Sequence, residues 1–182
     1  IHIYTKCQYC NALLFSKEGV CVEISIFADS AEIEVIREFK SNPLIDGFTT
    51  NPTLIRKAGV SDYLLFASEA VGVSNPLPIS LEVFSDDLDD MFRQAQVLSS
   101  LGNNIFVKIP ITNTQGISTS FLTSRLNEIG VNVNITAIMS TQQISDYLEN
   151  IDKEATNIFS VFAGRIADTG RDPIPINGRG QK

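Results

Sequence analysis

A single lysine stands in the middle of an apolar segment, which is an unfavourable place for a charged amine. Lys108 lies within residues 106–110 and is flanked by Val107 and Ile109. Burying an ammonium costs free energy unless the group is paired or loses its proton. The neutral amine is a nucleophile that condenses with ketones to a Schiff base. The alternative is a structural lysine whose amine reaches solvent at the rim of the fold.

Two carboxylates and one amide fall at the ends of other apolar segments: Asp29, Glu82 and Asn51. Cleaving the carbon–carbon bond beside a Schiff base requires a base that removes the substrate hydroxyl proton, and the reverse addition requires an acid. Asp29 and Glu82 are the carboxylates at these ends. An aspartate at a strand end also commonly caps the following helix.

Further polar residues lie in the C-terminal half. Asn134 and Thr136 are two positions apart, so in a strand both face the same side. Ser160 lies in the next apolar segment, and Arg165 follows it closely. Taken alone, each of these polar residues is explained equally well by a structural role in the fold. Together with the lysine and the two carboxylates, they favour a catalytic site.

Six short apolar segments recur along the chain, each of a length typical of buried strands. They cover residues 23–28, 46–50, 78–83, 104–109, 131–136 and 157–162. Several are apolar on both faces, as strands of parallel sheets are.

Segments with helical spacing lie between these predicted strands. The clearest covers residues 85–101, with Ser85 as the N-cap, Asp86 and Asp87 in the first turn, and Gly102 at the end. Other predicted helices cover residues 31–39, 61–71, 117–129 and 141–148.

Alternating strands and helices predict an α/β fold with a parallel sheet and crossover helices. The first strand–helix connection, residues 28–31, has no glycine-rich phosphate loop, which weighs against a doubly wound dinucleotide-binding sheet. We predict a (β/α)8 fold of the TIM-barrel type with only about six of the eight β/α units present. The polar residues would then meet at the C-terminal mouth of the barrel.

Four motifs, in family order, resemble those of the transaldolases. Residues 46–55 read DGFTTNPTLI, and residues 107–110, VKIP, resemble the segment that carries the Schiff-base lysine. Residues 132–136 resemble the fifth strand of the family. Residues 160–168, SVFAGRIAD, resemble the sixth, with Val161 in place of a proline. The resemblance covers roughly residues 23 to 175.

The resemblance implies transfer of a dihydroxyacetone unit from a ketose phosphate to an aldose phosphate in the pentose phosphate pathway. Fructose 6-phosphate and erythrose 4-phosphate are typical partners of the family. Lys108 would form the Schiff base and Asp29 would act as acid and base. Glu82 and Thr136 would hold a water that relays protons.

The resemblance also implies a set of substrate-binding residues. Asn51 and Asn134 would bind hydroxyl groups of the donor, with Ser160 beside them. Arg165 would grip the phosphate through its forked donors. No metal and no organic cofactor is implied, and the implied partners are small sugar phosphates.

Fructose 6-phosphate aldolases resemble transaldolases and form the nearest alternative. They typically carry glutamine where Glu82 stands and tyrosine where Phe162 stands. This chain has the transaldolase residue at both positions, which favours a transferase.

The C-terminal end departs from the family pattern. Few residues follow Arg165, so we expect the seventh and eighth β/α units to be missing, and Arg179 to be a poor substitute for the family's second phosphate-binding arginine. Such an open barrel exposes strand edges, which predicts instability or a homo-oligomer. A catalytically impaired, truncated remnant is therefore a second hypothesis.

The N-terminal segment has a different character. Residues 3–10, IYTKCQYC, resemble the entrance of a glutaredoxin, in which a strand leads to Cys-x-x-Cys. A redox module with Cys7 as the attacking thiolate and Cys10 beside it is a third hypothesis. A zinc site is less favoured, because no second cysteine pair exists and His2 is the only histidine. The predicted organisation is an extension over 1–20, a barrel over 21–176 and a tail over 177–182.

Composition limits the possible partners and location. The net charge of −7 argues against nucleic acid as a partner. No apolar run approaches the roughly 18 residues of a membrane span, and no secretory signal is visible. Three cysteines do not suggest a disulfide framework, so a cytoplasmic location is expected.

Overall fold

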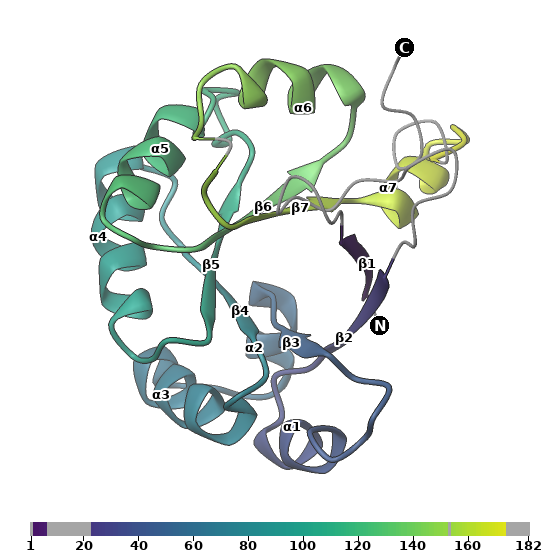
Figure 1. Ribbon diagram of the computed structural model, residues 1–182, viewed down its shortest axis with the longest axis vertical. Coiled ribbons are helices and arrows are strands. Elements are labelled where there is room, and N and C mark those ends of the chain that lie inside the picture. Colours follow the sequence, from purple (N-terminus) through teal and green to yellow (C-terminus); the bar gives the residue numbers. More distant parts are fainter. Residues whose placement is uncertain (1, 7–22, 153, 174–182) are drawn as a thin grey trace.

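The computed structural model of the chain describes residues 2–6, 23–152 and 154–173 (Figure 1). The predicted Cys7–Cys10 pair, Arg179 and the tail over 177–182 lie outside the described residues.

A single sheet forms the centre of the fold, with seven strands in the order β1 to β7. Six of them are parallel: β2 (Glu23–Asp29), β3 (Gly47–Thr49), β4 (Ile79–Glu82), β5 (Ile105–Pro110), β6 (Val133–Ile138) and β7 (Asn157–Val161). These are the six predicted strands. Their ends shift only slightly, most in β6, which begins at residue 133 rather than 131. The strand β1 (His2–Lys6) pairs antiparallel with β2.

Most of the helices connect successive parallel strands and lie along the outside of the curled sheet (Figure 1). Their bounds are α1 (Ile33–Phe39), α2 (Pro52–Lys57), α3 (Tyr63–Ser74), α4 (Leu88–Ser99), α5 (Ser120–Glu128), α6 (Thr141–Leu148) and α7 (Ala163–Asp168). The sequence predicted α6 with its observed bounds, whereas α2 and α7 were not predicted.

Both predicted ends of α4 were wrong. Asp87, not Ser85, is the N-cap, because its carboxylate accepts a hydrogen bond from Asp90 N at 2.9 Å. The Ser85 hydroxyl accepts from Asp87 N instead, which forms a turn before the helix. Gly102 does not end the helix directly. A Cβ atom there would lie 2.5 Å from a Val71 side-chain carbon, so glycine allows close approach to α3.

The start of α5 also differs from the prediction. Residue 118 belongs to an isolated bridge between Thr112 and Ser118, so the helix begins at residue 120 rather than 117. The helices α1 and α3 also begin later than predicted, at residues 33 and 63.

The main apolar core lies between the outer face of the sheet and the helices. Leu81, Val107 and Ile135 are fully buried there and belong to one cluster with Met91 of α4 and Leu126 of α5. Burial of such side chains contributes roughly 1.5–3 kcal/mol each. The six parallel strands form a curled half-barrel with helices on its outer face (Figure 1). The predicted α/β fold of the TIM-barrel type is thus confirmed.

A small second cluster lies on the inner face of the sheet. It contains the buried side chains of Phe27 and Ile158, with Phe106 packed against them. Gly47 is the register partner of Phe27, and a Cβ atom at Gly47 would lie 2.4 Å from the Phe27 ring. The missing side chain at residue 47 therefore leaves room for the ring.

Gly47→Ala is expected to lower the free energy of unfolding by about 1–3 kcal/mol, because the packed Phe27 ring cannot move away freely. The measurement is urea-induced unfolding followed by circular dichroism. Gly164→Ala is the matched control, since a Cβ atom there would meet nothing within 4 Å. A Gly47→Ala variant as stable as the control would contradict this explanation.

Among the described residues, no helix combines the length and the apolar character required to cross a bilayer.

Candidate active site

The register between neighbouring strands places the polar residues on the inner face of the sheet. Glu82, Lys108 and Asn134 are successive partners across β4, β5 and β6. Asp29 pairs with Thr49 at the ends of β2 and β3. Register partners in parallel strands face the same side, so these side chains share one surface. That surface lies opposite the main apolar core.

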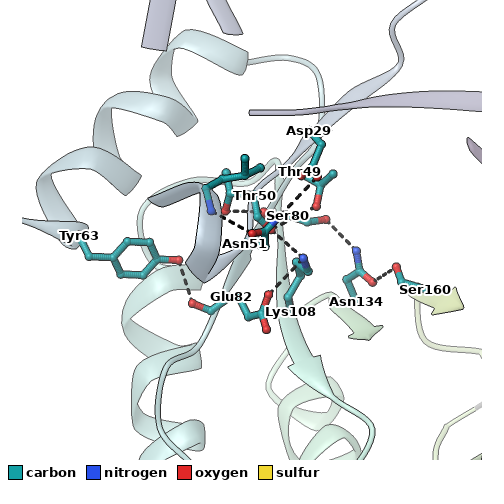
Figure 2. Close-up of polar contacts among 11 residues, drawn as sticks. Asp29, Thr49, Thr50, Asn51, Tyr63, Ser80, Glu82, Lys108, Asn134 and Ser160 are labelled. Atoms are coloured by element: carbon teal, nitrogen blue, oxygen red, sulfur yellow. Dashed lines mark hydrogen bonds and ion pairs between the residues drawn. The ribbon is translucent and has the colours of Figure 1, made fainter. Parts of the chain in front are cut away.

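Lys108 lies inside the fold with its amine paired. The residue is 6% exposed. Its Nζ donates a hydrogen bond to the backbone oxygen of Thr50 at 2.7 Å and lies 3.2 Å from Glu82 Oε2 (Figure 2). A structural lysine with its amine in bulk solvent is inconsistent with this burial.

The TTNP motif builds the wall beside this amine. Thr50 supplies the backbone oxygen that Lys108 contacts. Asn51 is the N-cap of α2, and its Oδ1 accepts from Leu54 N at 3.0 Å. Pro52 occupies the first turn of that helix, where its missing N–H costs nothing. The Asn51 Nδ2 atom donates to Asp29 Oδ2 at 3.4 Å, so the cap residue also orients the carboxylate.

Asn134 is held by two serines on the neighbouring strands. Ser160 Oγ donates to Asn134 Oδ1 at 2.6 Å, and Asn134 Nδ2 donates to Ser80 Oγ at 3.0 Å (Figure 2). All three residues are buried. Ser80 was not predicted as a site residue, although its place between Ile79 and Leu81 follows the same alternation that revealed Lys108.

Thr136 lies one inward position beyond Asn134 along β6. It is 2% exposed, and its Oγ1 has no hydrogen-bond partner among the described residues. A buried hydroxyl without a partner is costly. It is therefore a group that could bind a small polar molecule.

Arg165 is separated from this cluster. Its side chain on α7 is 76% exposed, and its Nη1 atom lies 3.9 Å from Asp168 Oδ2 on the same helix. On this short helix Ile166 is the buried residue, so Arg165 faces solvent. The structure brings together the other predicted site residues but does not join Arg165 to them.

Tyr63 supports the strand that carries Glu82. Its hydroxyl donates to the Glu82 backbone oxygen at 2.9 Å, and its ring packs edge-on against Phe84 (Figure 2). Burial raises the pKa of Tyr63 well above its usual range, and the negative charge of Glu82 adds to the rise. The hydroxyl thus stays protonated and fixes the end of β4.

Tyr63→Phe is expected to lower the free energy of unfolding by about 1 kcal/mol at neutral pH, because a backbone oxygen loses its donor. Since the folded pKa is raised, the tyrosine stabilises the fold below the unfolded pKa of about 10, and this contribution is lost as the pH rises above it. The variant should therefore lose less stability than the unchanged chain between neutral pH and pH of about 11. Urea unfolding at both pH values checks this, and equal losses would contradict it.

Within the described residues, no group of three or more histidine, cysteine, aspartate or glutamate side chains could hold a metal ion.

The sequence model of the transaldolase/fructose-6-phosphate aldolase family matches residues 26–177. The chain belongs to this family. It is 34% identical over 153 residues to a probable transaldolase of Maridesulfovibrio salexigens, covering 84% of this chain and 67% of that protein. It is also 34% identical over 149 residues to a probable transaldolase of Methanococcus maripaludis, covering 82% and 65%. This transaldolase-family chain thus spans about two thirds of the length of these relatives.

A solved structure resembles the fold of this family member. A chain from the crystal structures of CdNal from Clostridium difficile in complex with mannosamine aligns with a TM-score of 0.52 and 13% sequence identity. The alignment covers 84% of this chain and 61% of that one. At this identity the likeness supports the fold alone.

Proposed function

We propose that the chain acts as a transaldolase of the pentose phosphate pathway. It would transfer a dihydroxyacetone unit between ketose and aldose phosphates through a Schiff base on Lys108. The observation that carries the proposal is the buried Lys108 amine on the inner face, 3.2 Å from Glu82 Oε2. Membership of the family supports the same reading.

The first step forms the Schiff base. Glu82 takes a proton from the Lys108 ammonium, and the neutral amine adds to the ketone carbon of the donor. A second proton passes from the nitrogen to the former ketone oxygen, which becomes a hydroxyl group. The protonated Glu82 then returns the proton to the departing hydroxyl, so that water leaves and an iminium remains. Glu82 and the Thr136 hydroxyl, which has no partner among the residues that the structure describes, would hold the water that relays these protons.

The second step breaks the carbon–carbon bond. Asp29 removes the proton from the hydroxyl next to the breaking bond, and the bonding electrons pass to the iminium to give an enamine. An aldose phosphate leaves, and the enamine adds to the carbonyl of a second aldose phosphate while Asp29 returns the proton to the new hydroxyl. Water then hydrolyses the resulting iminium, which releases the new ketose phosphate and restores the Lys108 amine. The contact from Asn51 Nδ2 orients the Asp29 carboxylate for this task.

The remaining residues would bind the sugar. Asn51 and Asn134 present amide groups on the inner face, and Ser160 contacts Asn134 directly. Arg165 stands on α7, directly after β7, so its exposed guanidinium could meet a phosphate at the carboxyl end of the sheet. No metal or organic cofactor takes part in this scheme.

A fructose 6-phosphate aldolase is the second candidate, because the family name covers both activities. Glu82 and Phe162 favour the transferase. The test incubates the chain with fructose 6-phosphate, with and without erythrose 4-phosphate, and measures products by mass spectrometry. We expect a seven-carbon ketose phosphate only with the acceptor. Free dihydroxyacetone released without an acceptor would favour the aldolase, and no product in either case would favour the impaired remnant.

Other expectations from the sequence stay predictions. They are the division into an extension, a barrel and a tail, the cytoplasmic location, the absence of nucleic-acid partners and a homo-oligomeric state. The redox role of Cys7 and Cys10 also stays a prediction. Thiol titration before and after dithiothreitol tests it, and an unchanged count of free thiols would contradict it.

A further inference from the structure

We propose that Ala137 is a positioning residue, which maintains a β-bulge that keeps the Thr136 hydroxyl on the inner face with Lys108. The proposal rests on the function proposed above, because it assigns Ala137 an effect on the proton relay through Thr136.

The bulge is visible in the pairing of β6 with its two neighbours. On the β5 side the register is regular as far as Thr136, the partner of Pro110. On the β7 side Ile135 pairs with Phe159, whereas Ile138 pairs with Val161. The strand β6 therefore contains one more residue than β7 across this interval. A bulge of this kind changes the face of the sheet to which the following side chains point, and bulges are frequent beside active sites.

Ala137 has the backbone conformation that produces this extra residue. Its φ is 61°, which makes it the only non-glycine residue with positive φ among the described part of the chain. That left-handed region favours glycine and asparagine, and it is strained for alanine. Such strain persists where the surroundings impose it, and it is concentrated at functional sites.

The surroundings hold both sides of Ala137. Ile111 N donates to the backbone oxygen of Thr136 at 2.8 Å, and Phe162 N donates to that of Ile138 at 2.9 Å. The two bonds tie β6 to the segments that follow β5 and β7. They fix the strand on either side of the strained residue.

The bulge resolves a conflict between side-chain alternation and the core. Asn134 and Thr136 point inward, so an unbroken strand would also point Ile138 inward, toward the polar surface. Ile138 is instead fully buried in the main apolar cluster. The extra residue thus leaves Thr136 facing inward while Ile138 returns to the core. The Thr136 hydroxyl, which is buried and has no hydrogen-bond partner within the described part of the chain, is what the arrangement presents to the site.

The test compares Ala137→Gly, Ala137→Asn and Ala137→Val. Glycine and asparagine accept positive φ, whereas a β-branched residue does not. The readout is the initial rate at which fructose 6-phosphate becomes trapped on Lys108 by borohydride, with melting temperature as the control for folding. We expect the rates of the Gly and Asn variants to stay within about threefold of the unchanged chain. The rate of the Val variant should fall by about 100-fold, the lower end of the usual general acid–base contribution.

A double-mutant cycle separates positioning from a general structural effect. Thr136→Ala should lose as much as Ala137→Val, and the double variant should be no slower than Thr136→Ala alone. If the rate of the double variant falls by the product of the two single losses, the proposal is overturned. A tenfold loss of rate in both the Gly and Asn variants would overturn it too. That second outcome can be measured even if the Val variant does not fold. If the unchanged chain forms no adduct at all, the proposed function fails first, and the inference fails with it.

Discussion

Lys108→Met is expected to form no borohydride-stable sugar adduct. The substitution removes the amine and keeps a side chain of similar length, so the inner face stays filled. Because the amine is the only part of residue 108 that can attack a ketone, trapping should fall to the background of the assay. Intact-mass spectrometry after incubation with fructose 6-phosphate and borohydride measures this directly.

Two controls make the result interpretable. Removing Lys108 leaves Glu82 without its cationic partner, which could destabilise the fold, so Lys108→Met combined with Glu82→Gln removes both charges together. Lys57→Ala removes an exposed lysine at the end of α2 and should leave the adduct unchanged. An adduct of full intensity in Lys108→Met would contradict the assignment of the amine.

Asp29→Asn is expected to separate formation of the Schiff base from cleavage of the sugar. The amide keeps the shape of the carboxylate but cannot take the hydroxyl proton. Cleavage should slow by about 100- to 10,000-fold, the usual contribution of a general base. Formation of the Schiff base should change little, because that step uses Glu82 in the proposed scheme.

The mass of the trapped adduct reports this separation. In the unchanged chain, reduction after cleavage should leave a three-carbon unit on Lys108. In Asp29→Asn the intact six-carbon sugar phosphate should accumulate instead. Asp146→Asn changes an exposed aspartate on α6 and serves as the matched control. A three-carbon adduct formed by Asp29→Asn at the normal rate would contradict the role of this carboxylate.

Alternation along the strands made most of the inner face predictable. A polar residue between two apolar neighbours, such as Lys108 between Val107 and Ile109, must face away from the core that buries those neighbours. The same rule applies to Asn134 and Thr136. Ser80 obeys it too, but a serine in a strand carries no charge and so gives a weak signal.

Other features depended on contacts that one strand cannot reveal. The pairing of Lys108 with Glu82 required the register between β4 and β5. The hydroxyl of Tyr63 reaches Glu82 from a helix 19 residues away in sequence. The bulge at Ala137 could not be predicted from the sequence, because alanine has no preference for positive φ. A glycine at this position of the strand would have indicated a bulge.

The position of Arg165 shows where motif and geometry diverge. The motif puts Arg165 five residues after Ser160, and in the structure it lies on α7, directly after the strand that carries Ser160. Its side chain, however, lies on the solvent side of a short helix, 76% exposed. Which way a long side chain turns depends on the neighbouring elements and not on the motif.

Peptide mapping of the trapped adduct tests the central claim most directly. The unchanged chain is incubated with fructose 6-phosphate, reduced with borohydride, digested and sequenced by tandem mass spectrometry. The buried, paired amine on the inner face predicts one modified residue, Lys108. Modification of an exposed lysine such as Lys57 in its place, or no modification at all, would contradict the account.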